Sequence, residues 1–267
     1  MSDAQPHHDD VTETTPVWRL SKGAGDHRVV RETVVAFMLN GRLLIRVSCL
    51  AHTLEDFALG FLASEGLVNG PQDISEVAVA KDLTSLSVRA EVDPYRLVAF
   101  RQRLAMSSGC GGAAACVEED LPPVDSDARF RPEDLGERMS ELQHASVLFR
   151  ETGGVHCSGV TDGATLFAFA EDVGRHNAVD KTMGRSLAEG IALDSVALLT
   201  TGRLSGDILS KVIRVGVPVV VSRGAATSRA IGLARASGIT AVGFARGRDM
   251  NVYTAAWRLG LSKEETP

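Results

Sequence analysis

Apolar and polar positions in the first half of the chain predict a β-rich region. Two apolar runs, at residues 33–39 and 43–47, flank Asn40-Gly41. This dipeptide favours a type I′ turn, so we expect the two runs to pair as a β-hairpin. Further strands are expected at residues 76–80 and 83–91.

Three helices are expected around these strands. Thr53 and Asp56 match a capping box, which predicts a helix start that Gly66 later ends. The pair Asp93-Pro94 supplies an N-cap and a first helical residue for a second helix. A third helix is expected to begin at Pro132, because apolar side chains recur after it at helical spacing.

The second half of the chain has a different periodicity. β-rich apolar runs lie at residues 196–201, 217–221 and 239–244, and helical segments at 207–215 and 227–236 separate them. Strands that alternate with helices at this spacing indicate βαβ units and a parallel sheet covered by helices. The predicted fold class is therefore α/β in this half and α+β for the chain as a whole.

These patterns divide the chain into four predicted parts. We expect a flexible polar tail at 1–28, a smaller N-terminal β/α region at 29–116, a linker loop at 117–130 and an α/β domain at 131–267. The linker is inferred from a proline pair and a cluster of acidic residues.

Composition narrows the possible classes of protein. The 267 residues are 44% hydrophobic and 23% charged, as in a globular protein with a sizeable core. A formal charge of −6 and only 5% aromatic residues argue against nucleic-acid and anionic-membrane partners. Neither a signal peptide nor an apolar run of about 20 residues is found, so we expect a cytoplasmic protein.

A cysteine loop carries the first candidate chemistry. Cys110 lies among Gly109, Gly111 and Gly112, and small residues continue to Cys116. An unobstructed thiolate on such a loop could act as a nucleophile. The same residues could equally be small hydrophobic groups in a tight turn. The C-x₅-C spacing differs from the C-x-x-C of redox and zinc sites.

Two further segments combine ionisable residues with glycines. Residues 171–181 contain six ionisable side chains around Gly174, between a predicted strand and a predicted helix. Such a corner is the usual position of a site in an α/β sheet, although a solvated helix start explains many runs of this kind. Glycines 153 and 154 could place His156 and Cys157 on a strand edge in a cleft, or both residues could simply pack.

Three loops rich in glycine and arginine follow the predicted parallel strands. They comprise residues 201–205, 222–228 and 244–249, and their backbone N–H groups, hydroxyls and guanidinium groups suit a phosphate. Because all three lie at the carboxyl ends of strands, we expect one anionic ligand along the sheet edge. Neither a Walker loop nor a G-x-G-x-x-G fingerprint is present.

Taken together, these segments resemble the FdhD family of formate dehydrogenase accessory proteins, over about residues 29–258. The matching motifs are EDFALGF at 55–61 with SEG at 64–66, SSGCG at 107–111, TGGVH at 152–156, EDVGRHNAVDK at 171–181, TGRLS at 201–205, AATS at 225–228, and GFAR at 243–246 with NVYT at 251–254.

The resemblance implies both a fold and an activity. It implies a cytidine deaminase-like, three-layer C-terminal domain with a mostly parallel sheet, beside the smaller β-containing N-terminal region. It also implies a sulfurtransferase that accepts persulfide sulfur from a cysteine desulfurase. The sulfur then passes to the bis(molybdopterin guanine dinucleotide) cofactor of molybdenum or tungsten, before that cofactor enters the catalytic subunit of formate dehydrogenase. A homodimer is implied as well.

The resemblance also assigns residues. Cys110 would carry the persulfide. The cofactor, which is polyanionic, would be contacted by one segment: Phe244, Ala245, Arg246, Gly247, Arg248 and Asp249. Four residues of the charged run are expected to shape that edge: Asp172, Arg175, His176 and Lys181. Many family members have C-x-x-C in the cysteine loop, whereas the second cysteine of this chain is displaced to Cys116.

Three alternative functions would each use part of this sequence. A zinc deaminase needs H-x-E and P-C-x-x-C, but His156 precedes Cys157 and Ser158 and the chain has no P-C-x-x-C, so we expect neither zinc nor another resident metal. A non-catalytic carrier of the molybdenum cofactor would explain the loops and make the cysteines incidental. A thiol–disulfide oxidoreductase is disfavoured by the Cys110–Cys116 spacing.

Overall fold

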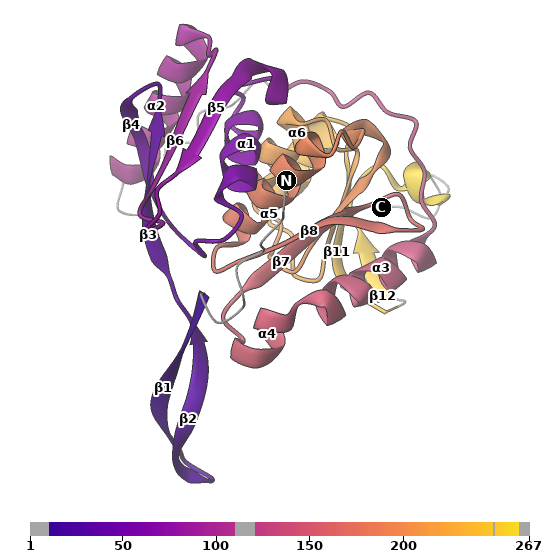
Figure 1. The fold of residues 1–267 in the computed structure, drawn as a ribbon. Coiled ribbons are helices and arrows are strands. Elements are labelled where there is room, and N and C mark those ends of the chain that lie inside the picture. The colour runs from indigo at the N-terminus through magenta and orange to yellow at the C-terminus, as the bar shows by residue number, and fades with distance from the viewer. Residues whose placement is uncertain (1–10, 110–120, 248, 262–267) are drawn as a thin grey trace.

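The computed structural model describes residues 11–109, 121–247 and 249–261. Figure 1 shows a long β-hairpin, a four-stranded sheet with helices on one face, and a larger domain around a six-stranded sheet. Within the described parts of the chain, no helix is long and apolar enough to cross a membrane.

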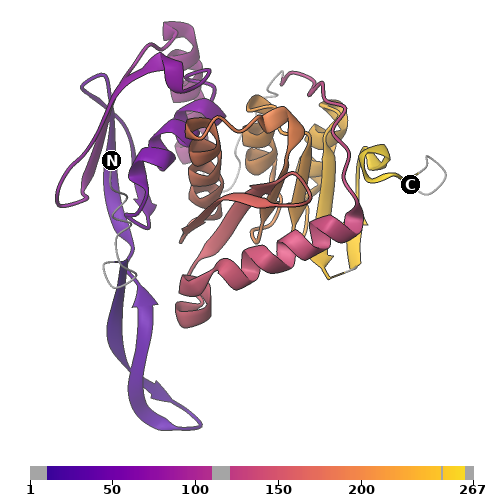
Figure 2. The same ribbon diagram turned by 45° about the vertical axis from the view of Figure 1, so that its right-hand side comes forward.

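The hairpin consists of β1 (Thr12–Arg19) and β2 (Gly23–Val30), which pair in antiparallel register along their full length. It projects away from the rest of the molecule in both orientations (Figures 1 and 2). The prediction of a flexible tail at 1–28 is therefore wrong for residues 12–28. Only the base of the hairpin packs on an apolar cluster, through Val30, so its sequence lacks the apolar alternation by which strands are recognised.

The four-stranded sheet has the strand order β4-β3-β6-β5. Its strands are β3 (Thr33–Leu39), β4 (Arg42–Cys49), β5 (Ile74–Val79) and β6 (Ser85–Ala90). The predicted β3–β4 hairpin is confirmed: Asn40 and Gly41 have φ angles of 50° and 77°, as a type I′ turn requires. β3 also pairs with β6 in parallel.

Helices α1 (Leu54–Ser64) and α2 (Pro94–Gly109) cover one face of this sheet. Phe37 of β3 packs against two aromatic rings of α1, with centroid distances of 5.6 and 6.1 Å. The predicted start of α2 is confirmed by a 2.8 Å bond from the Tyr95 N–H to Asp93 Oδ1. The capping box at Thr53 is wrong, because Thr53 has a φ of 48° and its side chain caps no N–H.

The six-stranded sheet has the order β12-β11-β10-β9-β7-β8. Its strands are β7 (His156–Thr161), β8 (Leu166–Asp172), β9 (Ala197–Thr200), β10 (Val219–Ser222), β11 (Thr240–Arg246) and β12 (Asp249–Val252). The central strands β9, β10 and β11 are parallel, as predicted. The sheet is nevertheless mixed rather than mostly parallel, because β7, β8 and β12 pair with their neighbours in antiparallel register.

Helices lie on both faces of this sheet, which makes three layers (Figure 2). On one face lies α3 (Pro132–Ala145), followed by the short α4 (Val147–Thr152). On the other lie α5 (Arg175–Ala188), α6 (Gly206–Arg214) and α7 (Ser228–Ala236). Short 3₁₀ turns occupy Pro71–Asp73, Leu193–Ser195 and Ala256–Leu259.

The two regions meet where α1 crosses α5. A Cβ atom added to Gly60 would lie 1.7 Å from the Asp180 carbonyl oxygen, and one added to Gly184 would lie 1.8 Å from the Asp56 carbonyl oxygen. Only glycine at both positions permits so close an approach of the two backbones. This contact fixes the N-terminal region against the helix that begins at the charged segment 171–181.

Candidate functional site

One edge of the six-stranded sheet collects most of the motifs. The parallel strands β9, β10 and β11 end there, and the antiparallel strand β7 begins there, with His156 opposite Asp172 in register. The N-termini of α5, α6 and α7 follow directly, with Gly174, Ser205 and Thr227 at their N-cap positions. The sequence prediction that these loops converge on one sheet edge is confirmed.

Hydrogen bonds hold the loops of this edge together. Ser222 Oγ donates to the Gly202 carbonyl oxygen at 2.6 Å, and the Phe244 N–H donates to the Gly224 carbonyl oxygen at 2.9 Å. Leu204 forms an isolated parallel bridge with Ala226. The backbone N–H groups at the edge are therefore held in fixed positions.

Cationic side chains at this edge lack partners. Arg175, Arg203 and Arg223 have no acidic partner within the described residues, and the buried Nε of Arg175 has no hydrogen-bond acceptor there either. The Ser205 hydroxyl and His176 Nε2 are also buried and unpaired among those residues. Buried polar atoms without a partner are uncommon in folded proteins, and each calls for an explanation.

The electrostatics of the edge are positive. Burial lowers the pKa of Arg175, and the neighbouring Arg203 lowers it further. Burial also lowers the pKa of His176 to about 4, with Arg175 and Lys211 acting in the same direction. The pKa of His156 is lowered mainly by burial and then by Arg175. Both imidazoles are therefore neutral at pH 7, so the arginines carry the positive charge available to an anion.

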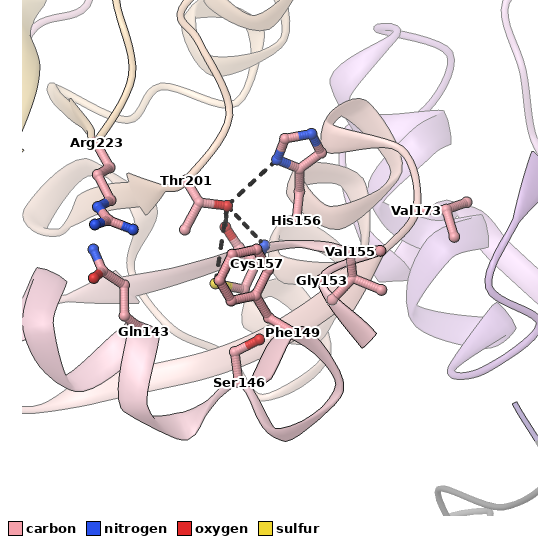
Figure 3. Close-up of a pocket in the computed structure, with 11 residues that line it drawn as sticks. Gln143, Ser146, Phe149, Gly153, Val155, His156, Cys157, Val173, Thr201 and Arg223 are labelled. Carbon is pink, nitrogen blue, oxygen red and sulfur yellow. Dashed lines mark hydrogen bonds between the residues drawn. The ribbon is translucent and has the colours of Figure 1, made fainter. Parts of the chain in front are cut away.

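A cavity of about 290 Å³ opens at the same edge. It is lined by Gln143, Ser146, Phe149, Gly153, Gly154, Val155, His156, Cys157, Val173, Thr201 and Arg223. In Figure 3 the Arg223 guanidinium group faces the Gln143 amide, and the Thr201 hydroxyl lies between His156 and Cys157. Both alternatives considered for His156 and Cys157 hold in part, because both residues line this cavity while Cys157 is also buried. The residues that α3 and α4 contribute to the cavity were not predicted, since the sequence shows only an apolar stripe there.

The described cysteines are poorly suited to nucleophilic chemistry. Cys157 is buried, and its Sγ lies 4.0 Å from Thr201 Oγ1. Burial raises the pKa of Cys157 to about 11 and that of Cys49 to about 12. Both side chains are therefore neutral thiols at pH 7. Cys110 and Cys116 lie outside the described residues, so the prediction for the cysteine loop remains a prediction.

The segment predicted to contact the cofactor forms a β-hairpin instead of preceding a helix. Phe244, at a φ of 52°, is partly exposed, and the Arg246 guanidinium group lies 5.7 Å from its ring centroid. Ala245 is buried, so only its backbone is available to a ligand. Gly247 forms the turn, and Asp249 pairs with Arg246 in the ladder. Arg248 lies outside the described residues.

Asp172 and Lys181 do not present their side chains at the edge, although Asp172 Oδ1 accepts from the Gly174 N–H at 2.9 Å and so fixes the start of α5 there. Both are fully buried and form an ion pair with 2.7 Å between Lys181 Nζ and Asp172 Oδ2. Asp172 also accepts from the Leu50 N–H at 3.1 Å, and Lys181 donates to the Leu50 carbonyl oxygen at 2.8 Å. Both side chains are thus used to join the end of β4 to α5, while Arg175 and His176 remain at the edge.

A second buried network at this junction was not predicted. Lys211 of α6 lies 2.8 Å from Glu65 Oε1 and 3.0 Å from Asp180 Oδ1, and Ser64 Oγ donates to Asp180 at 2.6 Å. Burial favours the neutral form of Glu65, but Lys211 and then Arg214 hold its pKa down at about 2. We refer to both networks together, with the Gly60–Gly184 contact, as the junction.

Comparison with known proteins places the chain in a family. Residues 30–260 match the model of the FdhD/NarQ family. The chain is 34% identical over 232 residues to the sulfur carrier protein FdhD of Methanothermobacter thermautotrophicus, covering 87% of this chain and 91% of that protein. It is 32% identical over 261 residues to the sulfur carrier protein FdhD of Bacillus subtilis, covering 94% and 99%.

A solved structure agrees with this result. The crystal structure described as that of a formate dehydrogenase accessory protein from Desulfotalea psychrophila superposes with a TM-score of 0.75 at 30% identity, covering 93% of this chain and 98% of that one. Fold and site together define a mixed α/β protein whose positive sheet edge suits an anionic ligand. The chain belongs to the FdhD/NarQ family.

Proposed function

We propose that this protein is a sulfurtransferase that loads a polyanionic molybdenum or tungsten cofactor with sulfur for formate dehydrogenase. The observation that carries the proposal is the edge itself: Arg175, Arg203 and Arg223 lack anionic partners among the described residues, and the Ser205 hydroxyl beside them is buried and unpaired. The pyrophosphates of the bis(molybdopterin guanine dinucleotide) cofactor would supply the missing negative charge.

The sulfur step is assigned to Cys110. Its thiolate attacks the terminal sulfur of a persulfide on a cysteine desulfurase, the desulfurase thiolate leaves, and Cys110 becomes a persulfide. One S–S bond breaks as a similar S–S bond forms, so no external oxidant is needed. The terminal sulfur atom would then pass to the metal of the bound cofactor, which is the substrate of this step. The S–S bond would break, Cys110 would leave as a thiolate, and the metal in its reduced state would supply the two electrons that make the sulfur a sulfido ligand. The high pKa values of Cys49 and Cys157 support the choice of a cysteine in the loop.

Within the bound complex, the residues of the edge would bind and orient. Arg203 and Arg223 would pair with phosphate oxygens, and the fixed N–H groups at the starts of α5 and α6 would add hydrogen bonds. Phe244 and Arg246 would extend the contact along β11 toward a guanine end. The cofactor-binding role of residues 244–249 and the cytidine deaminase-like classification of the domain remain part of the proposal.

Intact-mass measurement tests the sulfur step. The wild-type protein, Cys110→Ala and Cys116→Ala are each incubated with a cysteine desulfurase and cysteine. A reducible gain of one sulfur atom, lost only in Cys110→Ala, is expected. If the wild type gains no sulfur beside an active desulfurase, the protein would instead be a non-catalytic carrier, the second candidate that the charged edge supports.

A further inference from the structure

The described part of α2 presents an exposed face that carries no charged residue at its centre. Tyr95 is 85% exposed and Val98 is 53% exposed, and the two lie one turn apart on the same side of the helix. Ala99 and Gln102 are exposed beside them. Tyrosine and valine are weaker helix formers than alanine, lysine or glutamate, so helix stability does not explain their presence at exposed positions. Such a face is suited to contact with another protein.

Helix α3, which also lies at the surface, has the opposite composition. It contains four acidic residues, and Arg138 pairs with Glu141 at 3.1 Å, as expected of a helix turned to water. Helix α2 contains three arginines and neither aspartate nor glutamate, although the chain as a whole has a formal charge of −6. Its exposed side is thus apolar and basic, which complements a protein surface with an apolar centre and an acidic rim.

The three arginines of α2 differ in what they contact. Arg96 Nη1 donates to the Asn69 side-chain oxygen at 2.9 Å, and Arg103 Nη2 lies 3.4 Å from Glu65 Oε2, so both attach α2 to the segment that follows α1. Arg101 is exposed, and none of the ion pairs among the described residues involves it. At three residues from Val98 it lies beside the apolar face. Two arginines therefore fix the helix, and the third is available to a partner.

This face lies close to the point where the cysteine loop begins. Helix α2 ends at Gly109, and Cys110 is the next residue in the sequence. At about 1.5 Å per residue, Gln102 is on the order of 10 Å along the helix axis from that end. A standard interface buries about 800 Å² on each partner, a patch roughly 30 Å across, so a protein bound on α2 also covers the end of the helix. In Figure 1, α2 lies beside the four-stranded sheet and apart from α3 and α4, so such a protein leaves the cavity at the edge open.

We propose that the exposed face of α2 is the surface on which the sulfur-donor protein docks, through a patch of the donor that is apolar at its centre and acidic at its rim. Tyr95 and Val98 contact the centre of that patch, and Arg101 pairs with a carboxylate of its rim. The donor is favoured over the enzyme that receives the cofactor, because the receiving Cys110 directly follows α2 whereas the anion site is at the edge of the other sheet. This inference rests on the proposed function and adds to it the surface that the donor recognises.

Persulfide loading from two donors, followed by intact mass, tests the docking surface. The protein donor is a purified cysteine desulfurase supplied with cysteine. The small donor is inorganic polysulfide, whose S–S bond the Cys110 thiolate attacks while a shorter polysulfide leaves, so no docking is needed. Tyr95→Ser combined with Val98→Ser should slow loading from the desulfurase at least about tenfold, because anchors at the centre of an interface dominate its affinity. Arg101→Glu should also slow it, because it places a like charge against the acidic rim. Loading from polysulfide should be unchanged in both variants.

The matched controls change exposed residues elsewhere. They are Val34→Ser, at a side chain that is 59% exposed on the sheet face opposite α1 and α2, and Arg235→Glu in the last turn of α7. Both should load at the wild-type rate from either donor. Variants of α2 that load from the desulfurase as fast as the wild type, or that are slowed equally with both donors, would overturn the docking surface and leave the proposed function intact. A wild type that gains sulfur from neither donor would overturn the proposed function and this inference with it. Circular dichroism spectra establish that all variants remain folded.

Discussion

The junction and the edge are both rich in charged residues, yet they differ in how those charges are paired. At the junction, Lys181 meets Asp172 at 2.7 Å, and Lys211 meets both Asp180 and Glu65. At the edge, a few residues away along the same helix α5, Arg175 forms no ion pair within the described residues; burial lowers its pKa, Arg203 lowers it further, and Asp207 offsets this only in part. Within the described structure, the charged groups of the junction are paired with opposite charges, whereas the arginines of the edge are not.

This difference separates structural from ligand-binding use of the same motif. A buried charge without a counter-charge costs several kcal/mol, so the complete pairs of the junction are explained by folding alone. The buried unpaired atoms of the edge, which belong to Arg175, His176 and Ser205, have no such explanation within the described structure, and the proposed anion would supply their partner. Under the proposed function the motif at 171–181 would serve both purposes, with Asp172, Asp180 and Lys181 at the junction and the adjacent Arg175 and His176 at the edge.

The largest expected effect comes from breaking the junction. Lys181→Met leaves the Asp172 carboxylate buried without its cation, and we expect a loss of about 3–5 kcal/mol in the free energy of unfolding. Urea denaturation measures this loss. The matched control is Arg185→Met, which removes one partner of the exposed i,i+4 pair with Glu189 and should cost at most about 0.5 kcal/mol.

A second variant distinguishes charge from packing. Adding Asp172→Asn to Lys181→Met removes the stranded negative charge and keeps one acceptor oxygen, which serves one of the two N–H donors that Asp172 binds through separate oxygens, Leu50 and Gly174. The double variant should therefore be more stable than Lys181→Met alone. Equal stabilities of the two variants would mean that Lys181 contributes through packing instead of charge.

The second largest expected effect is a loss of anion binding at the edge. Arg203→Ala should weaken the binding of inorganic pyrophosphate, used as a probe of the anion site, at least about tenfold while changing stability by less than about 0.5 kcal/mol. Calorimetric titration and urea denaturation measure the two quantities. Arg235→Ala, in the last turn of α7, is the control because it removes an exposed arginine at the other end of that helix.

If Arg203→Ala leaves pyrophosphate binding unchanged, the unpaired arginines do not define an anion site. The contrast between the edge as a ligand site and the junction as a structural contact would then fail. Binding at the edge should also weaken as salt is added, because exposed charges are screened.

The sequence predicts the edge better than the junction because the two depend on different kinds of information. Each edge loop follows its own strand, so the local pattern of strand, glycine and arginine locates it. The Asp172–Lys181 pair instead depends on Leu50, which is 122 residues from Asp172 and contributes only backbone atoms. From the sequence alone, a run of charged residues is interpreted as solvent-exposed unless the distant segment that buries it is known.

The strands of the two sheets and of the projecting hairpin show the same difference between locally specified and distantly specified structure. The β3–β4 hairpin was predictable because Asn40-Gly41 specifies its turn locally. The β1–β2 hairpin has no buried face, so no apolar alternation marks its strands. The antiparallel strands at the margins of the larger sheet were equally hidden, since a short connection after β11 resembles the loops that lead to helices.

A smaller effect should follow from pH. The pKa of His176 is lowered to about 4 by burial and by nearby cations, whereas an unfolded histidine titrates near 6.5. Its contribution to stability is therefore complete above about pH 6.5 and is lost as the pH falls toward 4. Comparing urea denaturation of the wild type and His176→Gln at pH 7.5 and 5.0 should show a weaker pH dependence in the variant. The same dependence in both would assign the effect to other groups.

The smallest and most discriminating effect contrasts two N-caps. Thr227 Oγ1 accepts from the Ala230 N–H at 3.3 Å and caps α7, whereas the Ser205 side chain caps nothing at the start of α6. Thr227→Ala should therefore cost about 1 kcal/mol of stability. Ser205→Ala should cost little stability but should weaken pyrophosphate binding, since its buried hydroxyl is unpaired in the described structure.

Thermal denaturation and pyrophosphate titration on the two N-cap variants give a two-by-two comparison. The paired hydroxyl should affect stability and the unpaired hydroxyl should affect binding, just as the charges of the junction and the edge should. If Ser205→Ala were as destabilising as Thr227→Ala and left binding unchanged, an unpaired polar atom at this edge would no longer identify a ligand contact. The assignment of Arg175 and His176 to the edge would then depend on their positive environment alone.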